Sequence, residues 1–440
     1  MTSVLRKLKQ PFFRKRPAMD LTRCPAIIAA SECLADKLLD PTVIEYEFER
    51  LWASSSGPEA PVEAACSPEN APKNRYVNVV PFDRNRVFLS GVSGGDYINA
   101  SLITGDPAES QSMATAHWLA SPRKMSSVSS QASSSHSVGS SSQQPASSSL
   151  QGGVGSSSPH KASSSLQGGV GSSSPYKASS SQQSSLLSTP VQRPNSPPTS
   201  PPKISPSRAY IATQGPLPTT TADFWQMLHE QKTVVIVMLT RHIEDASVPK
   251  CASYYPAKVG DSQTFGDFTV AVRAAEDYGT DIRHRRLLLT DMRTGRQREV
   301  QHYHYHRWPD HGIPSSTIPI RRLAHVLEQG IVSAPQPPGP SAVHCSAGIG
   351  RTGTFLVVDM VLRRLRGLDP KDVTGARQAV NIKRIVAALR KERAGMVQSL
   401  PQYLFCYRAI KEELDDVIAG KSRSIAVVPL ANGDASLRTP

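Results

Sequence analysis

Cysteine is scarce in this sequence, and aromatic residues are few. The 440 residues include six cysteines, and 6% of all residues are Phe, Trp or Tyr. The cysteines form no CxxC pair and no other metal-ligand spacing, so we expect no metal centre. Six thiols are also too sparse for a disulfide scaffold, which favours a reducing compartment, and we expect a cytoplasmic protein.

Long apolar runs are absent, and acidic residues are outnumbered. Runs such as TVVIVML at 233–239 fall far short of the roughly 18 residues that a membrane span needs, and they indicate buried strands. The net charge of +14 suits acidic partners, although it is spread thinly. The first twenty residues hold six Lys/Arg without an apolar segment after them, so we expect no secretory signal. This tail suits anionic lipid, nucleic acid or a targeting signal, and the alternative is a solvated end. For the protein as a whole we expect no nucleic-acid partner.

Serine dominates one long stretch, from about residue 108 to 207, together with Gln, Gly and Pro. The unit ASSSLQGGVGSSSPHK at 146–161 recurs at 162–177, with Tyr176 in place of His160 as the single change. Each copy offers one Leu and one Val, too little apolar surface to offset the entropy of ordering its backbone. We therefore predict a disordered insertion. Its Ser-Pro and Thr-Pro pairs are sites of the type that proline-directed kinases phosphorylate, and an unmodified neutral repeat is an equal alternative.

Patterns typical of a globular domain flank this insertion. Helical periodicity predicts helices over 41–52, 219–231, 316–330, 373–395 and 400–418. Uncharged runs predict buried strands at 232–240 and 340–345, and alternation predicts antiparallel strands over 265–278 and 282–308. The predicted organisation is a partly disordered basic tail at 1–40, one domain over 41–107 and 208–418, the insertion at 108–207, and a C-terminal tail at 419–440.

The stretch VHCSAGIGRTGTF at 343–355 predicts a strand, a glycine-rich loop and a helix around Cys345. Successive N–H groups of such a loop line one concavity that suits a dianion, and the dipole of the following helix points there too. Arg351 can bind two phosphate oxygens at once, and the positive potential favours a nucleophilic thiolate. The alternative is a buried structural thiol under a tight turn, which the glycines and Arg351 disfavour. The N–H groups of the loop belong to Ser346, Ala347, Gly348, Ile349, Gly350 and Arg351.

The same stretch resembles the signature loop of the phosphotyrosine-specific, cysteine-based protein tyrosine phosphatases of the non-receptor type. Six further segments resemble motifs of this family, in the family's order. The resemblance covers about 275 of the 440 residues. It implies an α/β (α+β) fold, with one phosphatase domain built on a central, highly twisted mixed sheet flanked by helices, and no cofactor. The six segments are KNRYVNVVPFDRNRV at 73–87, DYINAS at 96–101, YIATQGPLPTTTADFW at 210–225, KCASYYP at 250–256, WPDHGIP at 308–314 and MVQSLPQY at 396–403.

This resemblance implies a two-step hydrolysis of phosphotyrosine in signalling proteins. Cys345 would attack phosphorus while Arg351 binds the phosphoryl oxygens. Asp310 would protonate the departing tyrosine oxygen and then act as a base. Gln398 would position the hydrolytic water, and Gln402 would assist.

Other residues have supporting roles by the same resemblance. Thr352 would stabilise the departing thiolate, and His344 would hold the loop from behind. Tyr76 would stack on the phosphotyrosine ring, and Asn78 would contact the substrate backbone. Glu244 is a partner for Arg351 in the family, but the spacing to the next motif is one residue longer here, which leaves that pair open.

Three other interpretations stay open at this stage. A dual-specificity or phosphoinositide phosphatase would need a shallow cleft, whereas Tyr76 and its loop indicate a deep one. A catalytically dead phosphotyrosine-binding module is disfavoured by the intact Cys345, Arg351 and Asp310. The run HYHYH at 302–306 suggests a metal, yet no Cys or acid accompanies it, and its alternation favours one face of a strand.

Overall fold

The computed structural model describes most of the chain outside the serine-rich stretch, and all described residues belong to one compact unit. The insertion predicted to be disordered and both chain ends lie outside the described residues, as does Asp310. No helix of the described part is long and apolar enough to cross a membrane. The described ranges are 21–54, 60–90, 95–105, 209–244, 248–309, 312–334 and 338–422.

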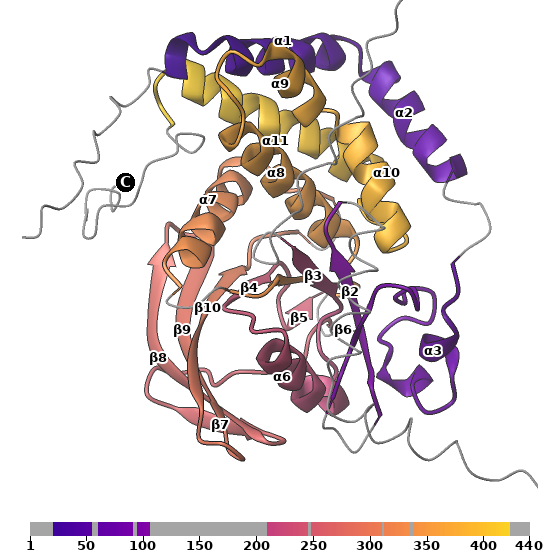
Figure 1. Cartoon of the computed structure of the whole chain (residues 1–440), viewed down its shortest axis with the longest axis vertical. Helices are drawn as coiled ribbons and strands as arrows, with labels where there is room; N and C mark the ends of the chain where they lie inside the picture. The colour runs from indigo at the N-terminus through magenta and orange to yellow at the C-terminus, as the bar shows by residue number, and fades with distance from the viewer. Residues whose placement is uncertain are drawn as a thin grey trace, which may run out of the picture. The chain divides into compact units, whose positions relative to one another are not determined.

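A mixed sheet of nine strands forms the centre of the described structure (Figure 1). The four strands β3, β11, β4 and β10 run parallel, and the outer strands pair antiparallel on either side of them. The predicted α/β fold with a mixed sheet flanked by helices is confirmed. In spatial order the strands are β1 (Arg86–Phe88), β2 (Tyr97–Ile103), β3 (Tyr210–Thr213), β11 (Ser341–His344), β4 (Val235–Met238), β10 (Gln297–Tyr305), β9 (Ile282–Asp291), β8 (Phe268–Tyr278) and β7 (Ser262–Phe265).

Burial on both faces explains why three of the central strands, β3, β11 and β4, contain no charged residue. In β4, Val235 and Val237 join one apolar cluster, whereas Ile236 and Met238 join the other. Because successive side chains point to opposite faces of the sheet, this strand contributes to the apolar core on each face. The parallel strands also end at a common edge, and the catalytic loop predicted from the sequence begins there, after His344.

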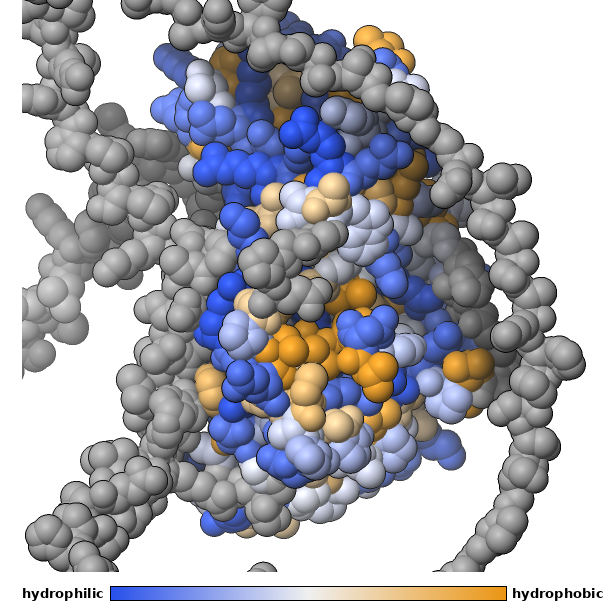
Figure 2. Space-filling model, turned by 90° about the vertical axis from the view of Figure 1, so that its right-hand side faces the viewer, coloured by the Kyte–Doolittle hydropathy of each residue, from blue (hydrophilic) through white to orange (hydrophobic). Residues whose placement is uncertain are grey.

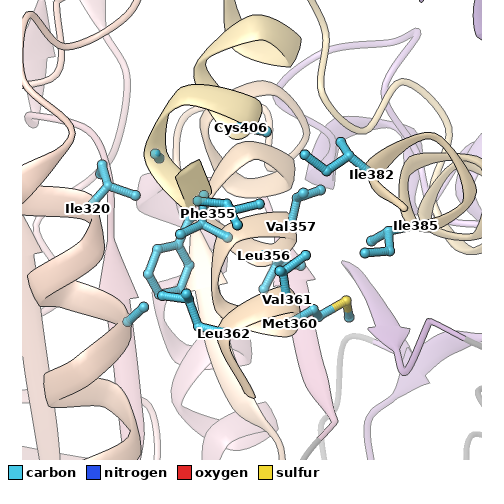
Figure 3. Packing of buried hydrophobic residues seen from close by; sticks show 14 of the residues in the cluster. Ile320, Phe355, Leu356, Val357, Met360, Val361, Leu362, Ile382, Ile385 and Cys406 are labelled. Carbon is cyan, nitrogen blue, oxygen red and sulfur yellow. The ribbon is translucent and has the colours of Figure 1, made fainter. Parts of the chain in front are cut away.

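Helices cover the two faces of the sheet unequally. The helix α6 (Thr221–Glu230) packs on one face, and α7 and α8 pack on the other (Figure 1). The helix α8 is surrounded by neighbours, because apolar side chains from α7, α10 and α11 converge on it (Figure 3). Burying each large apolar side chain contributes about 1.5–3 kcal/mol, so this packing holds the start of α8 firmly in place. The helices of this layer are α7 (Ile318–Val332), α8 (Gly350–Arg366), α10 (Ile382–Glu392) and α11 (Leu400–Ile418).

Two details differ from the sequence-based expectations. The segment 373–395 forms two helices, α9 (Val373–Ala379) and α10, because the Asn381 side chain caps α10 by accepting a bond from the N–H of Arg384 at 3.0 Å. The expected tail at 1–40 contains a packed helix, α1 (Pro25–Leu39), which contacts α9 and α11. The packed unit therefore begins before residue 41, ahead of α2 (Pro41–Ser54).

The predicted insertion leaves and re-enters the sheet at neighbouring strands. Ile103, the last residue of β2, lies opposite Tyr210, the first residue of β3. Because these ends already meet in an antiparallel pair, a long insertion between them leaves the pairing intact, and its closure entropy grows only slowly with length.

Candidate active site

The segment from Cys345 to Arg351 forms a tight loop between β11 and α8, as the sequence predicts. Gly348 has φ +75°, and a Cβ there would lie 2.2 Å from the carbonyl oxygen of Thr213. A Cβ at Gly353 would lie 2.5 Å from the backbone nitrogen of Val397. Only glycine fits at these two positions, because the loop passes directly against other backbone.

Cys345 lies at the floor of this loop. Its side chain is 4% exposed, and its Sγ accepts a hydrogen bond from the N–H of Gly348 at 3.2 Å. The helix α8 begins at Gly350, so its N-terminal dipole points toward the loop. The hydroxyl of Thr352 is fully buried and forms no hydrogen bond with any described residue. The thiol therefore sits among hydrogen-bond donors, an arrangement that favours negative charge on sulfur or on a bound anion.

Glu244 grips Arg351 with both carboxylate oxygens, which resolves the pair that the sequence left open. The Nη1–Oε1 distance is 2.7 Å, and the Nη2–Oε2 distance is 3.0 Å. The Glu244 carboxylate is nearly inaccessible to solvent and also accepts bonds from the Thr240 hydroxyl and the Arg241 N–H. Such a bidentate pair fixes the plane of the guanidinium group. Glu244 ends β5 (Ile243–Glu244), which pairs antiparallel with β6 (Val248–Pro249).

Arg351 also connects the loop with the segment expected to carry the general acid. It donates to the carbonyl oxygen of Pro309 at 3.2 Å. Trp308 is buried, and its indole N–H donates to the carbonyl oxygen of Gly312 at 3.3 Å. Asp310 itself lies outside the described residues. The described residues on either side of Asp310 are thus anchored, Pro309 to Arg351 and Gly312 to Trp308.

Sequence reasoning missed Arg393, which holds the loop from behind. This fully buried guanidinium group donates to the carbonyl oxygens of Gly348 at 3.0 Å and Ala347 at 3.1 Å, and to the side chains of Asn99 and Ser101. Burial lowers its pKa to about 10, so it stays charged at neutral pH. These carbonyl oxygens face Arg393 behind the loop, whereas the N–H group of Gly348 faces the sulfur of Cys345. The acceptors come from segments far apart in the sequence, so no local pattern could reveal the role.

A hydrogen-bond chain supports His344. Its Nδ1 lies 3.1 Å from the carbonyl oxygen of Cys345, which can only accept, so Nδ1 carries the proton. Its Nε2 then accepts from the Tyr254 hydroxyl at 2.8 Å, and that oxygen accepts from Nε2–H of His302, also at 2.8 Å. Burial lowers the pKa of His344 to about 4 and that of His302 well below its usual value, so both rings are neutral. Tyr254 and His302 are further positioning residues that sequence reasoning missed.

The run of alternating histidines lies in β10 up to Tyr305, with His306 directly after it, which confirms the strand interpretation. Among the described residues, no group of three His, Cys, Asp or Glu side chains converges as a metal site would require. His304 instead bonds the carbonyl oxygen of Thr240 at 2.8 Å. The alternation thus reflects a strand whose histidines bond to neighbouring segments.

Tyr76 forms one wall beside the loop. The Ser346 hydroxyl donates to the carbonyl oxygen of Lys250 at 3.1 Å, so it accepts from the Tyr76 hydroxyl, 2.9 Å away. Asn78 lies two residues further and is exposed to solvent. The phenol ring therefore has a fixed position next to the loop, while Asn78 is open to an approaching molecule.

Gln398 and Gln402 lie against the opposite end of the loop. A Cβ at Gly350 would be 3.1 Å from the Oε1 atom of Gln398 and 3.0 Å from that of Gln402. The Gln402 Oε1 accepts from the backbone N–H of Gln398 at 3.0 Å. Val397, just before them, has φ +58°, an uncommon value for a β-branched residue that often marks a functional segment. Both amides are therefore close enough to reach a small molecule above the loop.

Comparison with known proteins points to one family. A family model described as protein-tyrosine phosphatase matches residues 70–122 and 201–412. Protein-tyrosine-phosphatase PTP1 of Arabidopsis thaliana is 29% identical over 391 residues, 87% of this chain and 83% of that protein. Tyrosine-protein phosphatase 2 of Dictyostelium discoideum is 36% identical over 230 residues, 50% of this chain and 58% of that protein. Tyrosine-protein phosphatase non-receptor type 20 of Rattus norvegicus is 38% identical over 211 residues, 48% of this chain and 46% of that protein.

Proposed function

The chain belongs to the protein-tyrosine phosphatase family, a family of phosphoric monoester hydrolases, and we propose that it hydrolyses phosphotyrosine in proteins with Cys345 as the nucleophile. The observation that carries the proposal is the cradle around Cys345. It combines a thiol that accepts an N–H bond, the N-terminus of α8, and an arginine oriented by a buried carboxylate. A phosphate dianion has the charge and size that this cradle suits.

In the first step, the thiolate of Cys345 attacks phosphorus and forms an S–P bond, while the P–O bond to the tyrosine breaks. Asp310 gives its proton to the departing phenolate oxygen, so a neutral tyrosine leaves. Arg351 holds two of the phosphoryl oxygens throughout. The anchoring of Pro309 to Arg351 supports this role for Asp310, because it ties the start of the acid segment to the phosphate-binding side chain.

In the second step, water attacks the cysteinyl-phosphate intermediate. Asp310, now ionised, takes a proton from that water, the S–P bond breaks, and inorganic phosphate leaves. Gln398 orients the water with Gln402 beside it, which their approach to Gly350 supports. The hydroxyl of Thr352 stabilises the departing thiolate, and its lack of another described partner supports that role.

Tyr76 restricts the substrate to phosphotyrosine. Its ring is held by Ser346, the residue directly after the nucleophile, and it stacks on the substrate ring. A phosphoserine or phosphothreonine side chain is too short to pass such a wall and still reach the thiol. Asn78, exposed at the rim, contacts the backbone of the substrate.

The central test is hydrolysis of a phosphotyrosine peptide by the wild type, Cys345→Ser and Asp310→Ala. We expect kcat to fall at least about a thousandfold in Cys345→Ser, because a neutral hydroxyl replaces the thiolate, and about a hundredfold in Asp310→Ala. Cys66→Ser is the matched control, since Cys66 is exposed and lies outside the loop. Equal rates in the four proteins would contradict the mechanism.

A second test separates phosphotyrosine hydrolysis from the alternatives. The values of kcat/KM on phosphotyrosine, phosphothreonine and phosphoinositide substrates are compared under one condition. We expect phosphotyrosine to be preferred at least about a hundredfold. Higher efficiency on either other substrate would favour a shallow, less selective site, and binding without turnover would favour an inactive recognition module.

Two predictions fall on residues outside the described part of the chain. We keep as predictions that proline-directed kinases phosphorylate the segment 108–207, with an unmodified repeat as the equal alternative, and that the basic N-terminus contacts anionic membrane, with a solvated end as the alternative. The proposed location is cytoplasmic. The phosphatase domain is the one predicted over 41–107 and 208–418, extended to include α1. Deleting 108–207 and measuring activity and location tests whether that segment regulates the enzyme.

A further inference from the structure

The strand β2 ends where the serine-rich insertion begins. Its last residue, Ile103, pairs with Tyr210, and the described chain breaks after Gly105. The backbone N–H groups of Thr104 and Gly105 therefore lie beyond the strand pairing. Because a buried N–H group without an acceptor is costly, these two groups need a partner from another part of the protein.

That partner is the carboxylate of Glu392, at the end of α10. Its Oε1 accepts from the N–H of Thr104 at 2.9 Å and from the hydroxyl of the same residue at 3.0 Å, and its Oε2 accepts from the N–H of Gly105 at 3.0 Å. Hydrophilic side chains cover much of the face that includes α2, α3 (Glu63–Cys66) and α10 (Figure 2). Glu392 is instead 0% exposed, and its three donors offset the loss of water around the charge.

Arg393, which holds the catalytic loop, directly follows Glu392 and binds the same strand. Its guanidinium group donates to the Oδ1 atom of Asn99 at 2.7 Å and to the Oγ atom of Ser101 at 3.2 Å. These two residues are two positions apart in β2, so their side chains share one face. Glu392 and Arg393 thus attach the end of α10 to β2 at two places. Two attachments fix the direction of the guanidinium group, whereas a single attachment lets it pivot.

The same strand also holds the segment 73–80. The Asn99 amide donates to the Oδ1 atom of Asn74 at 2.9 Å and to the carbonyl oxygen of Val79 at 2.8 Å. The position of β2 therefore decides where both the catalytic loop and Tyr76 lie.

We infer that Glu392 is a positioning residue for the hydrolysis, because it holds the end of β2 so that Arg393 keeps the catalytic loop in place. The inference rests on the proposed function and adds a residue to its machinery. Glu392 acts at the point where the insertion begins and touches no reacting atom. Without it, Arg393 pivots away from the carbonyl oxygen of Gly348, and the N–H group of that glycine leaves the sulfur of Cys345.

The test compares Glu392→Leu with the wild type at a temperature at which circular dichroism shows both proteins folded. Hydrolysis of p-nitrophenyl phosphate gives kcat. Alkylation by iodoacetamide at pH 6, followed by mass spectrometry of the peptide that contains Cys345, reports the reactivity of the thiolate. We expect both rates to fall about tenfold in the variant, because the loop is no longer held in its reactive geometry.

Two other roles of Glu392 predict different results. A purely structural role leaves both rates of the folded variant unchanged. A direct electrostatic effect on the sulfur makes alkylation faster in Glu392→Leu, because the removal of a negative charge favours the thiolate. Either result would overturn the inference.

Two milder variants rank the contacts and decide the question where Glu392→Leu does not fold. Glu392→Gln keeps one oxygen that can accept from Thr104, so it should recover most of the loss and lower both rates only about threefold. Thr104→Val removes the hydroxyl bond alone and should lower both rates about twofold. Wild-type rates in both milder variants would contradict the positioning role.

Glu413→Leu is the matched control, since Glu413 is a buried carboxylate in α11 that pairs with Arg321 of α7 at 3.0 Å. It should lower thermal stability but keep both rates, and an equal loss of both rates in this control would overturn the inference. Alkylation needs no substrate. If the wild type does not hydrolyse p-nitrophenyl phosphate, the proposed function fails, whereas the alkylation rates still decide whether Glu392 positions the loop.

Discussion

Two segments meet at the hydrogen bond between Tyr76 and Ser346 and are built in opposite ways. The loop from Cys345 to Arg351 is buried and is held by Glu244, Arg393 and the chain that ends in His344. The segment 73–80 is also anchored, but it turns Val77 outward. Groups needed for the proposed chemistry are fixed from several sides, whereas the neighbouring segment leaves one apolar side chain exposed to solvent.

Replacing Arg393 with methionine should have the largest effect on stability and activity, because this side chain holds the buried loop. The change leaves the carbonyl oxygens of Gly348 and Ala347 and two side-chain acceptors without their donor. We expect the free energy of unfolding to fall by about 3–5 kcal/mol and kcat to collapse as the loop relaxes. Urea unfolding and peptide hydrolysis measure both. Lys391→Met, which removes an exposed cation nearby, should change neither by much, and a similar loss in both variants would refute the anchoring role.

Acidification should have the next largest effect, because it lowers the free energy of unfolding through two buried histidines. Burial lowers the pKa of His344 to about 4 and that of His304 to about 3. The unfolded chain takes up protons near pH 6.5 while these folded rings stay neutral, so the unfolded state binds more protons as the pH falls. The free energy of unfolding should therefore decrease from about pH 6.5 to about pH 4, by about 1.4 kcal/mol per pH unit for each histidine.

Urea unfolding at pH 7, 6 and 5 measures how the free energy of unfolding changes with pH. One variant tests whether His304 causes part of this slope. His304→Gln keeps a donor for the carbonyl oxygen of Thr240 but removes the titrating ring. The slope should become shallower in this variant. An unchanged slope would assign the acid sensitivity to other groups.

Removing the charge of Glu244 should have a smaller effect, confined to activity. In Glu244→Gln, one oxygen still accepts from Arg351, but the second bond and the negative charge are lost. We expect kcat/KM on a phosphotyrosine peptide to fall about tenfold to a hundredfold, because the guanidinium plane is no longer fixed. Glu45→Gln, an exposed change in α2, is the control. A wild-type rate in Glu244→Gln would show that Arg351 orients itself without help.

The smallest effect on activity is expected for Tyr76, whose hydroxyl joins the segment 73–80 to the loop. Tyr76→Phe keeps the ring but removes the hydroxyl that bonds Ser346. We expect kcat/KM to fall about threefold to tenfold, which is the contribution of one neutral hydrogen bond. Tyr46→Phe, at a residue that is 60% exposed, should have no effect. A loss above a hundredfold in Tyr76→Phe would mean that the recognition segment is as strictly held as the loop.

Much of the fold and the site could be predicted from local sequence. Uncharged runs identify β4 and β11, helical periodicity identifies α7 and α11, and the glycines around Cys345 identify the loop. The helix α1 and the break between α9 and α10 were not predicted. The helix α1 follows the basic first twenty residues, but its own sequence, PAIIAASECLADKLL, is apolar enough to indicate a packed helix. The break depends on the cap that the Asn381 side chain provides.

The sequence by itself determined the residue types that chemistry at the loop requires, because a nucleophile, an arginine and close-packed glycines must be adjacent along the chain. Only the tertiary structure decided what holds them. Glu244, Arg393 and Tyr254 come from three distant segments, and their hydrogen bonds exist only once the sheet and helices have assembled. The physical reason is the separation along the chain of the residues that interact. Backbone geometry depends on neighbouring residues, whereas the orientation of a buried charge depends on distant partners that folding brings together.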